Sequence, residues 1–190
     1  MKKLRLIFIF LFACCVMPEA YAQKVAVKSN LLYDATATFN LGVEFGLARK
    51  WTLDVPVNLN PWKFNDGTRL RHWGVQPEVR YWFCERFRRT FIGLHAHYAD
   101  FNVGNFPDWS FISENMKQNR YEGYLYAGIS VGHAWILKKR WGIEATIGLG
   151  YARIVYDKYP CAECGSRLKS DTRNYFGPTK VGISLIYLIK

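Results

Sequence analysis

The sequence predicts an all-β fold, namely an eight-stranded, antiparallel, up-and-down transmembrane β-barrel with a polar, plugged lumen. Three observations lead to this prediction. Apolar and polar residues alternate along most of the chain after residue 22, the alternating segments are about ten residues long, and glycines and charges gather on the polar face. Strict alternation indicates strands with one apolar and one polar face, and about ten residues suffice for a tilted strand to cross a bilayer.

The predicted strands follow one another with loops of unequal length. In order, they cover residues 25–34, 39–47, 51–60, 72–83, 92–98, 124–132, 142–151 and 180–189, of which the first is the least regular. An even strand number brings both chain ends to one side, where the connections 48–50, 84–89 and 137–140 are short. Of the connections on the other side, 35–38, 61–70, 99–120 and 157–174, three are long. Short periplasmic turns and longer external loops are typical of outer-membrane barrels.

The two faces of the predicted strands differ in composition. Most strand glycines lie on the polar face, where a narrow barrel interior needs room for large neighbours and a water-facing surface would gain nothing from glycine. This favours a polar interior and a lipid-facing apolar surface over a soluble barrel with an apolar interior. Six charges on the polar face are expected to form an ion-paired, hydrogen-bonded network in the lumen. They are Glu44, Glu78, Arg80, Glu122, Glu144 and Lys180.

Tryptophans gather near the ends of the predicted strands. Trp51, Trp82, Trp135 and Trp141 are next to the short basic turns, and Trp62, Trp73 and Trp109 are near the other ends. Amphipathic rings at both strand ends are typical of interfacial girdles in membrane proteins. The alternative is that they are ordinary core tryptophans.

Residues 1–22 have the anatomy of a secretory signal peptide. Lys2, Lys3 and Arg5 precede the apolar run 6–16, and small residues stand at Ala20 and Ala22. The run is too short to span a bilayer, so cleavage after Ala22 is expected to leave 23–190 as a barrel domain in the bacterial outer membrane. Lipidation of Cys14 is the alternative.

Composition limits the partners and cofactors that we expect. The chain has a formal net charge of +11, but an exported protein is not expected to bind nucleic acid; its basic turns suit anionic lipids, lipopolysaccharide phosphates or simply water. Cys161 and Cys164 form a lone CxxC, which favours a local disulfide over zinc. His95 and His97 both face the predicted lumen, and a hydrogen-bonded network is favoured there over a metal. No cofactor is expected.

The long external loops are the expected binding surface for a partner. Aromatic and arginine side chains are common anchors of protein interfaces, and the same mixture suits lipopolysaccharide. Interfacial positioning of the barrel is the alternative for Trp62 and Trp109. The candidate residues are Trp62, Phe64, Phe106, Trp109, Phe111 and Arg120.

Several motifs together resemble the Bacteroidetes family catalogued as domain of unknown function 3575. They are Asn30-Leu-Leu-Tyr-Asp-Ala-Thr36, Asn40-Leu-Gly-Val-Glu44, Asn60-Pro-Trp62, His72-Trp-Gly-Val-Gln-Pro-Glu-Val-Arg-Tyr-Trp82, Gly93-Leu-His-Ala-His97, Tyr121-Glu-Gly-Tyr124 and Phe176-Gly-Pro-Thr-Lys180. The resemblance covers the mature chain and implies a barrel in the outer membrane. It also implies a role in anchoring or assembling surface fibres of the fimbrial kind. The last strand resembles the signal that the barrel assembly machinery reads, although it ends in Lys190.

The expected function is therefore non-enzymatic, with the external loops engaging a surface fibre or lipoprotein partner. The alternative is an enzyme that modifies lipid A or phospholipid, for which His72, Asp108 and Ser110 are the candidate residues near the external rim. A diffusion pore is disfavoured because eight strands leave an interior that side chains fill.

Overall fold

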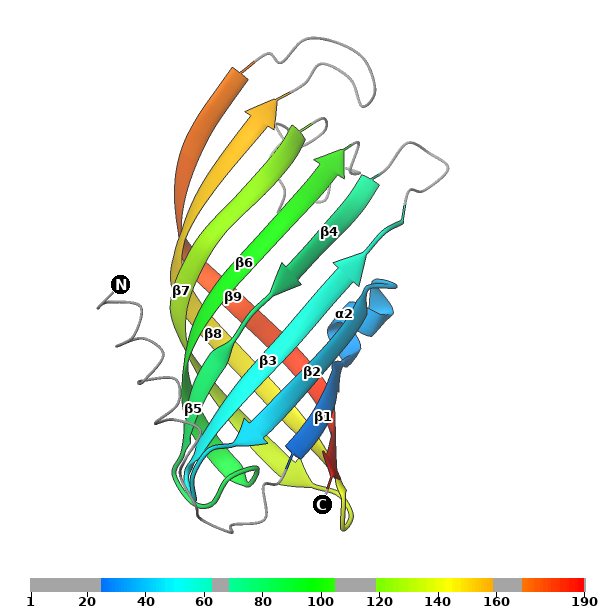
Figure 1. The fold of residues 1–190 in the computed structure, drawn as a ribbon, viewed down its shortest axis with the longest axis vertical. Coiled ribbons are helices and arrows are strands. Elements are labelled where there is room, and N and C mark those ends of the chain that lie inside the picture. Colours follow the sequence, from blue (N-terminus) through cyan, green and yellow to red (C-terminus); the bar gives the residue numbers. More distant parts are fainter. Residues whose placement is uncertain (1–24, 63–68, 105–118, 159–168, 190) are drawn as a thin grey trace, which may run out of the picture.

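The fold is a single antiparallel sheet whose first and last strands pair with each other. The computed structural model of the 190-residue chain describes residues 25–62, 69–104, 119–158 and 169–189. These form nine strands and one short helix (Figure 1). The elements are β1 (Val25–Asn30), α2 (Leu31–Ala35), β2 (Phe39–Gly46), β3 (Trp51–Asn60), β4 (Arg69–Val75), β5 (Glu78–Trp82), β6 (Arg89–Gly104), β7 (Asn119–Ile136), β8 (Trp141–Lys158) and β9 (Lys169–Ile189).

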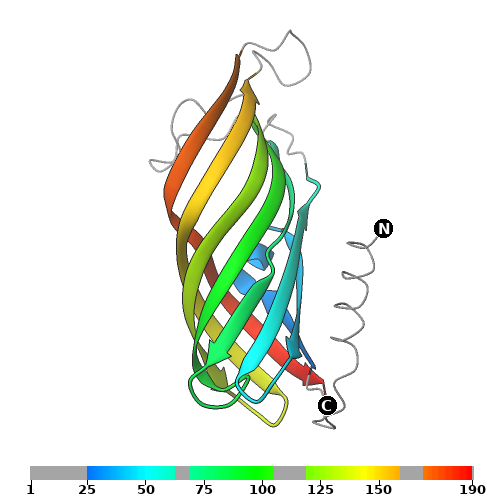
Figure 2. The same ribbon diagram turned by 60° about the vertical axis from the view of Figure 1, so that its left-hand side comes forward.

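Hydrogen bonding runs continuously around the sheet. β1 pairs with both β2 and β9, and each further strand pairs antiparallel with its neighbours, so the pairing returns to its start. The tilted strands are arranged in a ring, as Figures 1 and 2 show. No helix in the described part of the chain is long and apolar enough to span a membrane.

Burial follows the alternation of the sequence, with polar side chains inside the ring. On β3, Thr52, Asp54 and Asn58 are buried, whereas the intervening Val57 and Leu59 are about half exposed. Side chains that alternate along a strand lie on opposite faces of the sheet. The predicted polar interior and apolar outer face are therefore what the structure shows.

One predicted strand, 72–83, is broken into two. β4 and β5 are separated by Gln76 and Pro77, and both pair with β3 on one side and β6 on the other. Proline lacks a backbone N–H and therefore interrupts a ladder. The backbone carbonyl of Pro77 instead accepts from Ala96 N at 3.0 Å. The two strands share one position, so the nine strands occupy the eight positions that the sequence predicts.

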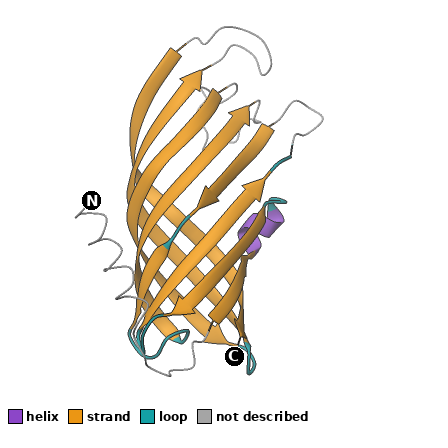
Figure 3. Cartoon of the chain, in the orientation of Figure 1, coloured by secondary structure: helices purple, strands orange, loops and turns teal. Residues whose placement is uncertain are grey.

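The predicted first strand, 25–34, is too long by four residues. β1 ends at Asn30, whose side-chain oxygen caps α2 by accepting from Leu32 N at 3.1 Å. Asn40 Nδ2 holds the helix to β2 by donating to Asp34 Oδ1 at 2.7 Å. Pairing of β1 with β9 stops at Asn30 and Ser184, so α2 occupies the wall above this point. Figure 3 shows it as the one helix between the described strands.

The second and third predicted strands agree with β2 and β3 to within one residue, and the last four strands are longer than predicted. β6, β7, β8 and β9 contain 16, 18, 18 and 21 residues and rise together on one side of the ring (Figure 2). They extend into the predicted loops 99–120 and 157–174, and β4 starts within 61–70. The opposite turns 48–50, 84–89 and 137–140 are short, as predicted, and lie at the end where β1 begins and β9 ends (Figure 1).

Inward-facing glycines make room for this packing, and Gly93, beside Glu78 and Ser130, allows a test. A Cβ at Gly93 would lie 2.7 Å from Glu78 Cδ and from Ser130 Oγ, whereas a Cβ at Gly42 would have its nearest neighbour at 3.4 Å. We expect Gly93→Ala to lower the free energy of unfolding by about 1–3 kcal/mol through overpacking. Gly42→Ala is the matched control and should change it by less than about 0.5 kcal/mol. Denaturant titration measures both, and equal losses would contradict this packing.

Candidate functional site

The interior is organised around one arginine. Arg80, on β5, is 1% exposed, and its guanidinium group contacts carboxylates from four positions. Because these residues alternate with apolar ones along their strands, all of them face inward. The contacts are Nη2 to Asp54 Oδ2 at 2.7 Å, Nε to Glu78 Oε2 at 2.6 Å, and Nη1 to Glu44 Oε2 and Glu144 Oε2 at 3.1 Å each.

Two lysines complete this ion cluster. Lys28 Nζ, on β1, pairs with Glu44 and lies 2.9 Å from Glu144 Oε2. Lys180 Nζ, on β9, lies 2.7 Å from Glu78 Oε2. The cluster thus joins β1, β2, β3, β5, β8 and β9 around the ring. It holds three cations and four carboxylates.

Neutral groups donate to the second oxygen of each of the three glutamates in the cluster. Thr52 Oγ1 donates to Glu44, Ser130 Oγ donates to Glu78, and Thr146 Oγ1 donates to Glu144 Oε1 at 3.0 Å. A buried ion pair is stable only when hydrogen bonds also serve its other polar atoms. These hydroxyls therefore allow the charges to stay buried.

Aromatic rings form the floor of the cluster. Arg80 Cζ lies 4.4 Å from the centroid of the Phe91 ring, a cation–π contact. Trp82 packs on Phe91, and its Nε1 donates to Thr52 Oγ1 at 2.9 Å. The assignment of Trp82 to the interfacial girdle is wrong, because this ring is fully buried inside the sheet. Charges and rings together fill the lower interior.

The structure brings together five of the six charges predicted for the lumen. Glu44, Glu78, Arg80, Glu144 and Lys180 are in the ion cluster. Glu122 lies in β7, in register with Asp100 and Val155, but its side chain is outside the described part. Sequence reasoning missed Asp54 and Lys28. Their signal was the same alternation, since both lie on the polar side of predicted strands.

Two of the predicted loop residues, Trp62 and Arg120, lie in the described part of the chain. Trp62 lies against the α2–β2 connection, where its Nε1 donates to Ala37 O at 2.7 Å and its ring is 5.9 Å from that of Phe39. Arg120 is in β7, with its side chain outside the described part. The others, together with the signal peptide and the predicted disulfide, lie outside the described residues: Phe64, Phe106, Trp109, Phe111, Cys161 and Cys164.

The histidine pair on β6 lies inside the ring. His95 is buried, and its Nε2 is 3.0 Å from Thr179 Oγ1 on β9, while His97 is half-buried. In the described ranges, no three His, Cys, Asp or Glu side chains are arranged to hold a metal. The histidines therefore extend the polar interior upward from the ion cluster.

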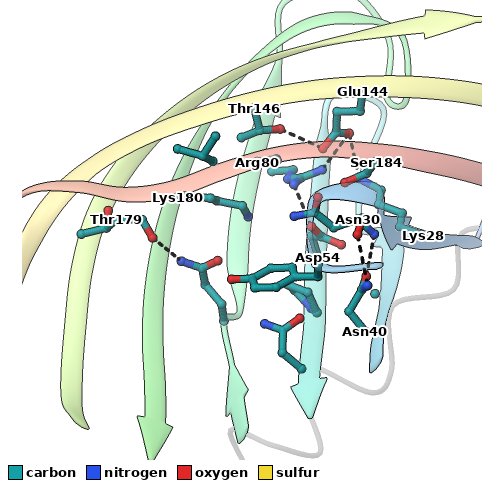
Figure 4. Close-up of a pocket in the computed structure, with 17 residues that line it drawn as sticks. Lys28, Asn30, Asn40, Asp54, Arg80, Glu144, Thr146, Thr179, Lys180 and Ser184 are labelled. Carbon is teal, nitrogen blue, oxygen red and sulfur yellow. Dashed lines mark hydrogen bonds and ion pairs between the residues drawn. The ribbon is translucent and has the colours of Figure 1, made fainter. Parts of the chain in front are cut away.

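A polar cavity of about 70 Å³ lies beside the ion cluster (Figure 4). Arg80, Asp54, Asn30 and Asn40 lie close together in its lining. Asn58, Gln76 and Tyr33 also line it. Charged, amide and hydroxyl groups at the boundary suit a small polar or ionic occupant rather than an apolar one.

The ion cluster leads to a direct test of stability. Arg80→Ala leaves four buried carboxylates with only two lysines to compensate their charge. We therefore expect the free energy of unfolding to fall by about 3–5 kcal/mol. Arg88→Ala is the matched control: its pair with Glu85 at 3.9 Å is exposed, so it should cost about 0–1 kcal/mol. Denaturant titrations of the two variants check this, and similar losses would show that the cluster is not structural.

Comparison with known proteins places this architecture in a family. No curated protein matches the chain. The sequence model of the family described as "Protein of unknown function (DUF3575)" matches residues 7–189, nearly the whole chain. The chain, with its closed antiparallel sheet and charged interior, belongs to the DUF3575 family.

Proposed function

We propose that this chain is a transmembrane β-barrel of the bacterial outer membrane, exported by a signal peptide at residues 1–22. The observation that carries the proposal is the reversed arrangement of polar and apolar side chains. Charges are buried inside the ring, while Leu94, Ile129 and Phe176 are 60–79% exposed on its surface. A water-soluble protein does not expose so extended an apolar surface, whereas a lipid-facing barrel requires one.

Aromatic side chains on the outer surface support a membrane position. Trp51, Trp135 and Trp141 are about half exposed beside the short turns. Toward the other end, Trp73 packs against Tyr98 with ring centroids 5.4 Å apart. Rings at both levels match the interfacial girdles of outer-membrane barrels. Lipids and lipopolysaccharide are then the immediate surroundings, and the barrel assembly machinery is the expected route of insertion.

The filled interior supports a structural role over a diffusion pore. The ion cluster and the rings of Trp82, Phe87 and Phe91 occupy the lower interior. A solute would have to break several buried ion pairs to pass. We therefore assign the protein a non-conducting role.

Anchoring or assembling a fimbria-like surface structure, through the external loops, is the role we propose for such a plugged barrel. The family resemblance and the aromatic and basic composition of residues 61–70, 99–120 and 157–174 support this role. Of the three candidate residues of the enzyme alternative, His72 lies in β4, and Asp108 and Ser110 lie outside the described residues.

Lipid contact predicts a specific cost for charge on the outer face. Leu94 pairs in register with Ile129 and Val79, in the middle of the apolar surface. We expect Leu94→Arg to lower the free energy of unfolding in liposomes by about 2–4 kcal/mol, because a charge would enter the hydrocarbon layer. Leu137→Arg is the matched control, because Leu137 is equally exposed but lies in a turn, and should cost about 0–1 kcal/mol. A Leu94→Arg protein that is as stable as the parent would mean that this face meets water.

The anchoring role is tested by deleting residues 105–118. The ring pairing involves only residues outside this segment, so the shortened protein should fold and insert, because its ladder closes without them. We expect the shortened protein to lose its attachment to surface fibres. Co-purification of fibre subunits from detergent-solubilised envelopes measures this attachment, and a deletion of the turn residues 138–139 is the control. Fibre recovery equal to that of the parent would exclude this loop as the attachment site.

A further inference from the structure

We infer that the polar cavity beside the ion cluster binds a monovalent alkali cation such as Na⁺ or K⁺. This inference goes beyond the proposed function and depends only on the described interior. It rests on the charge balance of the cluster, on one buried carboxylate oxygen without a hydrogen-bond donor, and on the oxygen-rich lining of the cavity.

The charge balance favours a cation. With all groups ionised, the four carboxylates Glu44, Asp54, Glu78 and Glu144 exceed the three cations Lys28, Arg80 and Lys180 by one negative charge. An uncompensated buried charge costs several kcal/mol. A single bound monovalent cation would neutralise the described cluster, whereas an anion would add to the excess.

Asp54 is the carboxylate whose oxygen is available to that cation. The residue is 3% exposed, and its Oδ2 lies 2.7 Å from Arg80 Nη2. Its Oδ1 is buried and finds no hydrogen-bond partner among the described residues. Oδ1 is directed over Gly42, since a Cβ built on Gly42 would lie 3.6 Å from it, and Gly42 and Asp54 both line the cavity.

Neutral oxygen donors complete the site. Asn58 and Gln76 are buried, and both line the cavity. Gln76 Nε2 donates to Thr179 O at 3.4 Å, which leaves its side-chain oxygen as an acceptor. One carboxylate oxygen with amide oxygens suits a monovalent ion better than Ca²⁺, which usually draws on several carboxylates.

The lining cations do not provide an anion site, because each is already engaged. Lys28 Nζ is held by Glu44 and Glu144, Arg80 makes four ion pairs, and Lys180 Nζ contacts Glu78. A phosphate or carboxylate ligand would have to displace these partners. At about 70 Å³, the cavity holds an ion with a few waters rather than a large organic molecule.

The test compares salts in thermal unfolding of the mature protein refolded in detergent. At equal ionic strength, the Tm in NaCl or KCl should exceed the Tm in N-methylglucamine chloride by about 3 °C or more, because the N-methylglucamine cation is too large for the cavity. This gain in Tm should saturate as the concentration of Na⁺ or K⁺ rises. Equal Tm values in the three salts, as expected for a cavity that holds only water, would overturn the inference. Such a result would not contradict the proposed membrane location. A protein that folds in detergent and shows no cation effect would contradict only the cation site.

Substitution locates the effect. Asp54→Asn should abolish the difference between NaCl and N-methylglucamine chloride, whatever its absolute Tm. The substitution removes the negative charge, and with the remaining oxygen facing Arg80 it places an amide NH₂ group, which cannot bind a cation, where Oδ1 was. Glu85→Gln is the matched control: it removes a carboxylate from an exposed turn pair with Arg49 and should keep the full difference. A cation effect that persists in Asp54→Asn would overturn the assignment of the site.

A second measurement covers the case in which Asp54→Asn does not refold. Sodium NMR relaxation on the parent protein should show line broadening that K⁺ reverses and N-methylglucamine does not. Asn58→Leu keeps every charge of the cluster and should weaken this broadening. Broadening that N-methylglucamine reverses equally would mean that Na⁺ is held only by general surface charge, and the inference would fail.

Discussion

The contact of the Arg80 guanidinium with four carboxylates is the interaction on which the interior depends. It joins residues from β2, β3, β5 and β8, and the two lysines extend the cluster to β1 and β9. Arginine suits this position because its planar group offers several donors in fixed directions. Ion pairs across the interior therefore connect the strands of the ring, in addition to the backbone hydrogen bonds between neighbouring strands.

The polar residues of the strands point inward and the apolar residues point outward. The strands that form this wall differ in length. β1 and β2 are short, while β7, β8 and β9 are more than twice as long as β1. The wall above β1 is completed by α2, held by Asn30 and Asn40. A helix this short leaves most of its backbone groups without partners inside the helix, and neighbouring groups supply some of them. Asn30 Oδ1 accepts from Leu32 N, and the carbonyls of Tyr33 and Asp34 accept from Thr36 N and Ala37 N. The polar cavity lies directly behind α2.

Alternation predicted where most strands lie and which side chains share a face, because residues two apart in a strand lie on the same side of a sheet. The glycines and charges of the polar face predicted that this face lies inside. Alternation could not place the end of β1, since Leu31, Leu32 and Tyr33 could also extend a strand, whereas in the structure Asn30 caps a helix that begins at Leu31. Trp82 was misplaced because a strand-end tryptophan suits either a girdle or a core. Asp54 escaped notice among other polar residues, because its significance comes from partners distant in sequence.

We propose that the outer face of the sheet, opposite the ion cluster, meets lipid. Spin labels placed singly along β3 in bilayer-refolded protein, with Cys84, Cys161 and Cys164 replaced by serine, measure this directly. If lipid covers this face, labels at Leu53, Val55 and Val57 should collide readily with oxygen and poorly with a water-soluble nickel chelate. A label at Asn58, which faces the interior, should be immobile and shielded from oxygen. High nickel accessibility at the three apolar positions would contradict this proposal.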